Sequence, residues 1–190
     1  TPQYRQWVER ADGYAAPGTV DRVRADVALG HAATGSRRLA EARLHARRAL
    51  DLSRRLDHSE SLFEATFLLL RPTLDWPQHE AERLELVEEI TRLPREGVSA
   101  EILGLVLLLG SSVYLDHGQR ERAEELWRQL GELGEHTHDS SVILDSMTCE
   151  AFFAALDGRL EETLAIGERL RERGQELGAP VYGLQRAGLV

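Results

Sequence analysis

The chain has 190 residues, of which 42% are hydrophobic and 29% are charged, and its formal net charge is −9. This balance is typical of a folded soluble domain rather than a disordered segment. The negative charge argues against binding to nucleic acid, which needs a basic face, and against docking on anionic membranes. The sequence contains arginine but no lysine, which excludes chemistry that needs a lysine, such as Schiff-base formation or a phosphate-loop lysine.

Targeting signals and long apolar segments are missing from the sequence. The longest apolar run, from Ile102 to Gly110, is far shorter than the roughly 20 residues that span a bilayer. The N-terminus has no secretory pattern, and the single cysteine, Cys149, cannot form an internal disulfide, which together favour a cytoplasmic location. Because the chain begins without methionine and ends in what reads as the first turns of another helix, we expect a fragment of a longer polypeptide.

Apolar residues recur at steps of three and four along nearly the whole chain, and no convincing strand pattern is present. Residues 1–18 predict the tail of a preceding helix and a loop, and residues 19–190 predict one helical-repeat domain. Short connections favour antiparallel neighbours. The helices are expected over about 19–34, 37–57, 60–74, 77–93, 99–116, 119–135, 140–157 and 159–177, with a last one beginning near Val181.

Three glycines open similar stretches of sequence and suggest a repeat. Gly118 and Gly158 are 40 residues apart, and Gly35 precedes Gly118 by 83, roughly twice that period. A fixed period of this size is the signature of stacked helical repeats. We expect Gly118 and Gly158 to adopt the left-handed conformation that closes a helix. The predicted units are 19–57, 59–94, 98–136, 139–178 and a partial unit, 180–190.

The repeat resembles the tetratricopeptide family, which has a turn glycine followed by apolar residues at fixed offsets. In the third unit the matching residues are Tyr114, Gly118, Ala123, Trp127 and Leu130. In the fourth they are Ala154, Gly158, Thr163, Gly167 and Leu170, of which Thr163 and Gly167 depart from type. The first unit fits only with two extra residues between Gly35 and Ala42. The second unit has Asp75-Trp76-Pro77 in place of the glycine, and Asp75 is predicted to cap the next helix.

A period of about 40 is longer than the usual 34 residues. It is similar to the helical arrays that follow an ATPase module in large bacterial regulators, including LuxR-type activators and nucleotide-cyclase-like signalling proteins. The resemblance implies an all-α, right-handed superhelix of four antiparallel helix pairs plus a partial terminal helix. It also implies a non-enzymatic module for protein docking or ligand sensing, without a cofactor.

In such stacks the first helix of each pair lines a concave groove. The alignment places Ser112 and Leu115 of helix 99–116 in that groove, with Thr148 and Phe152 of helix 140–157, and Phe67 as a further candidate. An apolar groove suits an amphipathic helix or an extended hydrophobic segment; a small-molecule inducer is the other ligand considered. Alternatively, these side chains pack against adjacent helices and bind nothing.

Two other functions stay open. The stack could associate with itself, as a homodimer, through an open terminal repeat or an apolar groove. The stretch from His136 through His138 to Asp139 could bind a metal, but zinc needs three or four converging ligands, and a polar turn with Asp139 or Ser140 as a helix cap explains the same residues. No catalytic constellation is present, so we expect neither an enzyme nor a metal protein.

Overall fold

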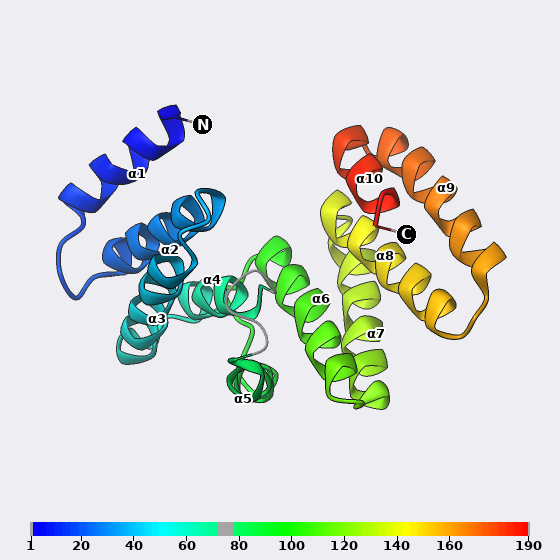
Figure 1. Cartoon of the computed structure of the whole chain (residues 1–190), viewed down its shortest axis with the longest axis horizontal. Helices are drawn as coiled ribbons and strands as arrows, with labels where there is room; N and C mark the ends of the chain where they lie inside the picture. Colours follow the sequence, from blue (N-terminus) through cyan, green and yellow to red (C-terminus); the bar gives the residue numbers. More distant parts are fainter. Residues whose placement is uncertain (1, 72–77, 190) are drawn as a thin grey trace. The chain divides into compact units, whose positions relative to one another are not determined.

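The computed structural model describes residues 2–71 and 78–189, and these ranges contain ten α-helices and no strand (Figure 1). The prediction of an all-α fold is therefore confirmed. None of the helices in the described ranges is both long and apolar enough to cross a membrane. The helices are α1 (Pro2–Tyr14), α2 (Val20–Gly35), α3 (Leu39–Leu56), α4 (Ser59–Leu70), α5 (Glu80–Ile90), α6 (Ala100–Asp116), α7 (Arg120–Thr137), α8 (Ser140–Leu156), α9 (Leu160–Glu176) and α10 (Pro180–Ala187).

Most predicted helix boundaries agree with the structure to within two residues, and the exceptions lie around α4 and α5. The predicted residues 72–74 of one helix, the cap at Asp75 and the start at Pro77 lie outside the described residues. Helix α5 ends at Ile90, three residues before the predicted end. Pro94 has no N–H and disfavours the helical conformation in the residue before it, which accounts for the earlier end.

The helices form two compact units, which we call the N-terminal unit (Thr1–Ile102) and the C-terminal unit (Leu103–Val190). In the N-terminal unit α2 packs against α1, α3 and α4, and α4 also packs against α5. In the C-terminal unit α8 packs against α7, α9 and α10. Most consecutive helices therefore pack on one another, an arrangement that is compatible with a helical repeat.

The turns between helices repeat at a regular interval. Among the residues that the structure describes, successive positions with left-handed backbone are 19 to 21 residues apart, except for Asp57 and Gly97, which are 40 apart and have residues 72–77, outside the described ranges, between them. At two of them, Gly118 and Gly158, the following N–H donates to the carbonyl five residues before it, at 2.8 and 2.9 Å, as in a Schellman motif. The predicted left-handed conformation of both glycines is confirmed. Within residues 2–71 and 78–189, the left-handed positions are Gly18, Arg37, Asp57, Gly97, Gly118, His138, Gly158 and Gly178.

Gly35 is not the turn residue of the first unit, so that part of the prediction is wrong. Gly35 is the last residue of α2, and the left-handed position is Arg37, with φ of 57°. Counted from Arg37, Ala42 stands at the same offset as Ala123 from Gly118, and both side chains are fully buried. The first unit thus needs no extra residues, because an arginine occupies the position that the pattern assigns to glycine.

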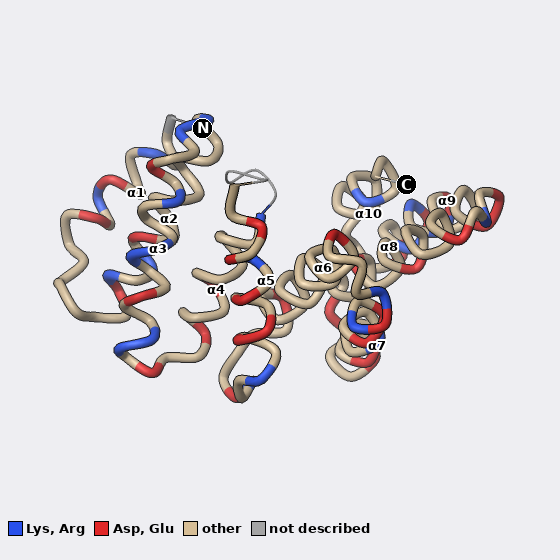
Figure 2. Tube along the Cα trace, turned by 60° about the horizontal axis from the view of Figure 1, so that its bottom comes forward, with Lys and Arg blue, Asp and Glu red and all other residues tan. Residues whose placement is uncertain are grey.

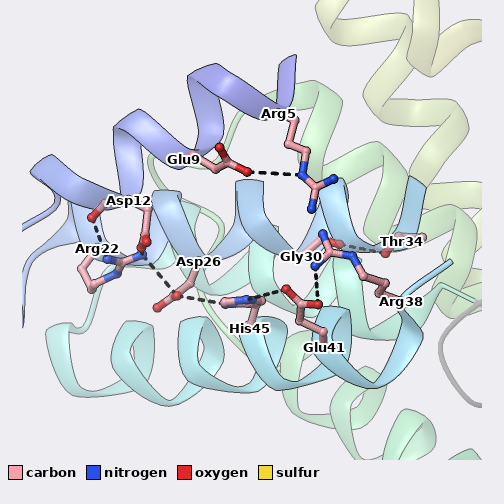
Figure 3. A network of polar contacts seen from close by, with 10 residues as sticks. All are labelled: Arg5, Glu9, Asp12, Arg22, Asp26, Gly30, Thr34, Arg38, Glu41 and His45. Atoms are coloured by element: carbon pink, nitrogen blue, oxygen red, sulfur yellow. Dashed lines mark hydrogen bonds and ion pairs between the residues drawn. The ribbon is translucent and has the colours of Figure 1, made fainter. Parts of the chain in front are cut away.

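Ion pairs connect α1, α2 and α3 (Figure 3). Arg22 of α2 lies 2.7 Å from the Asp12 carboxylate of α1 and 3.3 Å from Asp26. Asp26 is only 6% exposed, and its Oδ1 lies 3.4 Å from Nδ1 of His45 in α3. Because a buried carboxylate needs partners, this network places the three helices relative to one another.

Helix α10 is held on α8 and α9 by a buried ion pair and a close backbone contact. Asp145 of α8 is 2% exposed; its Oδ1 lies 2.6 Å from Nε of Arg186 and accepts a hydrogen bond from the Tyr182 hydroxyl at 2.8 Å. Burial raises the pKa of Asp145, and the charge of Arg186 opposes this shift. Gly174 of α9 and Gly183 of α10 meet where no side chain would fit.

Candidate binding groove

A groove with a volume of about 550 Å³ lies between α6 and α8 of the C-terminal unit. Its lining comes from Leu108 to Asp116 on α6 and from Cys149 to Leu156 on α8. Most of these side chains are apolar, with a few hydroxyl groups and one carboxylate. This composition is typical of ligand sites, which are mainly apolar with a small number of polar groups.

The hydroxyl groups of the groove are engaged within their own helix. Ser111 donates to the carbonyl of Leu108 at 2.8 Å, and Ser112 donates to the same carbonyl at 3.4 Å. A serine that bonds to the preceding turn of its helix offers little competition for an apolar ligand. The lining of the groove is therefore less polar than its residue types suggest.

Two large apolar side chains project at the edge of the groove. Phe152 is 40% exposed and Leu156, one turn further along α8, is 60% exposed. Leu115 lines the same cavity from α6 and is half-buried. Exposed apolar side chains gathered beside a cavity mark a binding surface, whereas single exposed apolar residues do not.

The back of the groove is held by aromatic packing between α7 and α8. Phe153 is 3% exposed, and its ring stacks on Trp127, with ring centroids 4.6 Å apart and planes inclined by 8°. The indole N–H of Trp127 donates to the carbonyl of Ser146 at 3.1 Å, and the Arg120 guanidinium lies 5.6 Å from the Phe153 centroid. The α8 wall is thus fixed before any ligand arrives, which lowers the entropic cost of binding.

Cys149 lies in the lining of the groove but is 2% exposed. Burial, with a smaller contribution from the Asp145 charge, raises the pKa of this thiol to about 12. The thiol is therefore protonated at neutral pH, whereas nucleophilic cysteines react as thiolates.

The structure brings together three of the five predicted groove residues. Ser112, Leu115 and Phe152 line the same cavity. Thr148 is 1% exposed, and its hydroxyl donates to the Leu144 carbonyl at 2.8 Å, so it is buried rather than part of the lining. Phe67 belongs to the N-terminal unit, where it is half-buried on α4 beside His31 and Arg71.

Seven residues of the groove lining were not predicted from the sequence, and spacing pointed to several of them, including Leu108 and Leu156. Leu108 lies one helical turn before Ser112, and Leu156 lies one turn after Phe152. Residues four apart share a helix face, so the same spacing rule would have added both. It would also have retained Thr148, which shows that spacing alone does not determine which residues of a face are covered.

The residues of the alternative metal site have other roles. Nδ1 of His136 lies 2.6 Å from the Glu132 carbonyl, and His138 ends α7 in the left-handed conformation. Asp139 caps α8: its Oδ1 accepts from the N–H groups of Ser141 and Val142 at 2.9 and 3.2 Å. Among the residues that the structure describes, no group of three or more His, Cys, Asp or Glu side chains could hold a metal ion.

A larger cavity, of about 710 Å³, lies between α1 and α2 but is a weaker candidate. Its lining includes Arg5, Glu9 and His31, and the Arg5–Glu9 ion pair at 3.3 Å is more than half exposed to solvent. Burial lowers the pKa of His31, as does the nearby Arg71 charge. The exposed charges make this cavity well hydrated, whereas the α6–α8 groove presents apolar side chains for contact.

The chain was also compared with known proteins. No protein-family model matches it, and searches of curated proteins and of solved structures found no match.

Proposed function

We propose that this chain is a non-enzymatic docking module whose groove between α6 and α8 binds an apolar segment of a partner protein. The observation that carries the proposal is the set of exposed apolar side chains, Phe152 and Leu156, beside a cavity of about 550 Å³ with a mainly apolar lining. The groove is bounded by two helices, a shape that suits an amphipathic helix with apolar residues at every third or fourth position.

The proposal is tested by selecting helical peptides from a display library on the full chain and measuring their affinity in solution. Phe152→Ala removes a large exposed contact and should weaken the selected peptides at least about tenfold, as expected when an aromatic interface residue is truncated. Leu44→Ala is the matched control, because Leu44 is a 50% exposed apolar residue of α3 that lies outside the groove lining. Peptides that bind both variants equally, or no enrichment at all, would contradict the proposal.

A second candidate is self-association through the apolar side chains of α9 and α10. Four of them are more than half exposed: Leu160, Leu164, Val181 and Leu184. Exposed apolar side chains on neighbouring helices can be buried against a second copy of the chain. Sedimentation equilibrium of the full chain, compared with Leu164→Glu, tests this candidate, and a monomer at the highest soluble concentration would exclude it.

The resemblance to arrays of bacterial regulators supports a sensor role in which the groove receives a partner segment or a small inducer. The regulator context is tested by the gene sequence on either side of these residues. An ATPase module upstream, with a DNA-binding or cyclase domain in the same reading frame, would support it. A reading frame without such domains would refute it and leave a separate adaptor as the function.

A further inference from the structure

The C-terminal unit carries most of the negative charge of the chain. Residues 103–190 hold 8 arginines against 15 aspartates and glutamates, a formal balance of −7, whereas residues 1–102 hold 15 against 17, a balance of −2. The groove therefore belongs to the strongly acidic half of the sequence. The summed field of such a unit attracts cationic ligands and repels anionic ones.

The two helices that line the groove carry only acidic charges. The arginines of the C-terminal unit lie on α7, α9 and α10 and in the turn before α9, whereas α6 and α8 carry acidic residues but no basic ones (Figure 2). Asp116 is the charged residue within the lining itself. On α8, Asp145 is engaged with Arg186, and the Glu150 carboxylate is 42% exposed, with Arg169 at 3.7 Å. The Arg120 guanidinium of α7, which lies 5.6 Å from the Phe153 centroid, is paired with Asp157 at 2.7 Å. An apolar groove between two helices that carry only acidic charges is complementary to an apolar stripe with basic flanks.

From this complementarity we infer that the partner segment is cationic: an amphipathic helix whose apolar face enters the groove and whose arginine or lysine residues flank that face. The inference rests on the proposed docking function and adds the charge of the partner. Apolar contacts supply affinity in such a complex, and the charges supply selectivity and a faster association.

The same charges disfavour a second copy of this chain as the occupant. Helices α9 and α10, which carry the other exposed apolar side chains, hold four arginines against five glutamates and so offer the groove of another copy no net positive charge, and the C-terminal unit as a whole has a balance of −7. Like charges brought together at an interface oppose association. A basic segment from a different protein meets no such repulsion.

The test uses three synthetic helical peptides that share the same apolar positions and differ only in their flanks, which are arginine, glutamine or glutamate. Their affinities for the full chain are measured by fluorescence anisotropy in about 50 mM and about 500 mM NaCl, because salt screens exposed charges over this range. We expect the arginine peptide to bind at least about tenfold more tightly than the glutamate peptide at low salt, and the difference to shrink at high salt. A fourth peptide, with the arginines kept and the apolar residues scattered around the helix, should not bind.

Two charge variants then locate the effect. Asp116→Asn should reduce the preference for the arginine peptide several-fold without changing the affinity of the glutamine peptide. Glu172→Gln removes the same charge from an exposed position on α9 and should leave the preference unchanged.

The outcomes separate this inference from the docking function. Equal affinity of the three peptides, with binding lost in Phe152→Ala, would overturn the cationic preference and leave the docking function intact. Tighter binding of the glutamate peptide would overturn the preference as well. Failure of all three peptides to bind, together with no enrichment in the display selection, would remove the docking function itself.

Discussion

At the scale of single residues, the turns show how much the repeat tolerates an unfavourable residue. Arg37, Asp57 and His138 have φ values of 57°, 50° and 53°, in the region that favours glycine. The left-handed conformation costs a residue with a Cβ about 1–2 kcal/mol. These positions keep it because the helices on either side pack together only if the chain reverses there.

The cost of the left-handed turn can be measured by exchanging residue types. Relative to Arg37→Ala, Arg37→Gly should raise the free energy of unfolding by about 1 kcal/mol, and Gly118→Ala should lower it by a similar amount. Urea unfolding followed by circular dichroism measures both. Gly13→Ala, within α1 and with open space around it, is the control for a glycine change without a turn. Equal stability of the two Arg37 variants would show that the turn stores no strain.

The cap at Asp139 predicts a pH-dependent stability. Hydrogen bonds from the Ser141 hydroxyl, and then from the N–H groups of Val142 and Ser141, lower the pKa of Asp139, while burial opposes this shift. A lowered pKa stabilises the fold above the unfolded-state pKa, and this stabilisation is lost as the pH falls through the folded-state pKa. Asp139→Ala should therefore cost about 1 kcal/mol at neutral pH, and this cost should diminish in acid.

Urea unfolding from neutral to acidic pH checks this prediction, with Asp139→Asn as the control. Asparagine caps helices without titrating. The difference in stability between Asp139→Asn and Asp139→Ala should therefore not show the pH dependence expected for the difference between the original chain and Asp139→Ala. A cost of Asp139→Ala that is independent of pH would show that the carboxylate charge contributes nothing to the cap.

At the scale of helices, the contact between α9 and α10 depends on two glycines. A Cβ at Gly183 would lie 2.7 Å from the Leu170 carbonyl oxygen and 2.8 Å from the Cα of Gly174, both backbone atoms. Backbone cannot yield as a flexible side chain can, so α10 would have to move off α9. The Asp145–Arg186 ion pair and the Tyr182 hydrogen bond would then be stretched as well.

We expect Gly183→Ala to destabilise the docking of α10 by about 1–3 kcal/mol, the usual cost of overpacking. Hydrogen exchange of the α10 amides measures this directly, because local opening accelerates exchange without global unfolding. Gly188→Ala is the matched control, since its added Cβ would lie at an ordinary distance of 3.5 Å from its neighbours. Unchanged protection of α10 in Gly183→Ala would contradict the close contact.

At the scale of the whole molecule, the net charge of −9 makes the two candidate functions respond oppositely to salt. Self-association brings like charges together, so screening should strengthen it. Binding of a cationic segment brings opposite charges together, so screening should weaken it.

Sedimentation and peptide titration in the same salt series should therefore give slopes of opposite sign. Between about 50 and about 500 mM NaCl, we expect the affinity of an arginine-flanked peptide to fall and any tendency to dimerise to rise. A peptide affinity that rises with salt would indicate binding by apolar contact alone. A dimer that dissociates with salt would indicate a contact between oppositely charged surfaces.

The sequence by itself determined the helices and their period. Apolar spacing of three and four residues is a local signal, and the turns at Gly118 and Gly158 follow from the conformational freedom of glycine, so both could be predicted without knowledge of packing. The resemblance to the tetratricopeptide pattern, which is also read from the sequence, placed Ser112, Leu115 and Phe152 in a groove, and the structure shows these three residues lining one cavity.

Only the tertiary structure decided which turns are made by a residue other than glycine and which residues of one helix face are buried. Arg37 takes the left-handed position because the surrounding helices require a reversal there, which outweighs the preference of the residue itself. Thr148 and Phe152 are one turn apart on α8, yet the first is 1% exposed and the second 40%. Asp145, one turn before Thr148, is bound by Tyr182 and Arg186 of α10. Burial is set by the helices that pack on a face, and these contacts join residues far apart in the sequence, where periodicity carries no information.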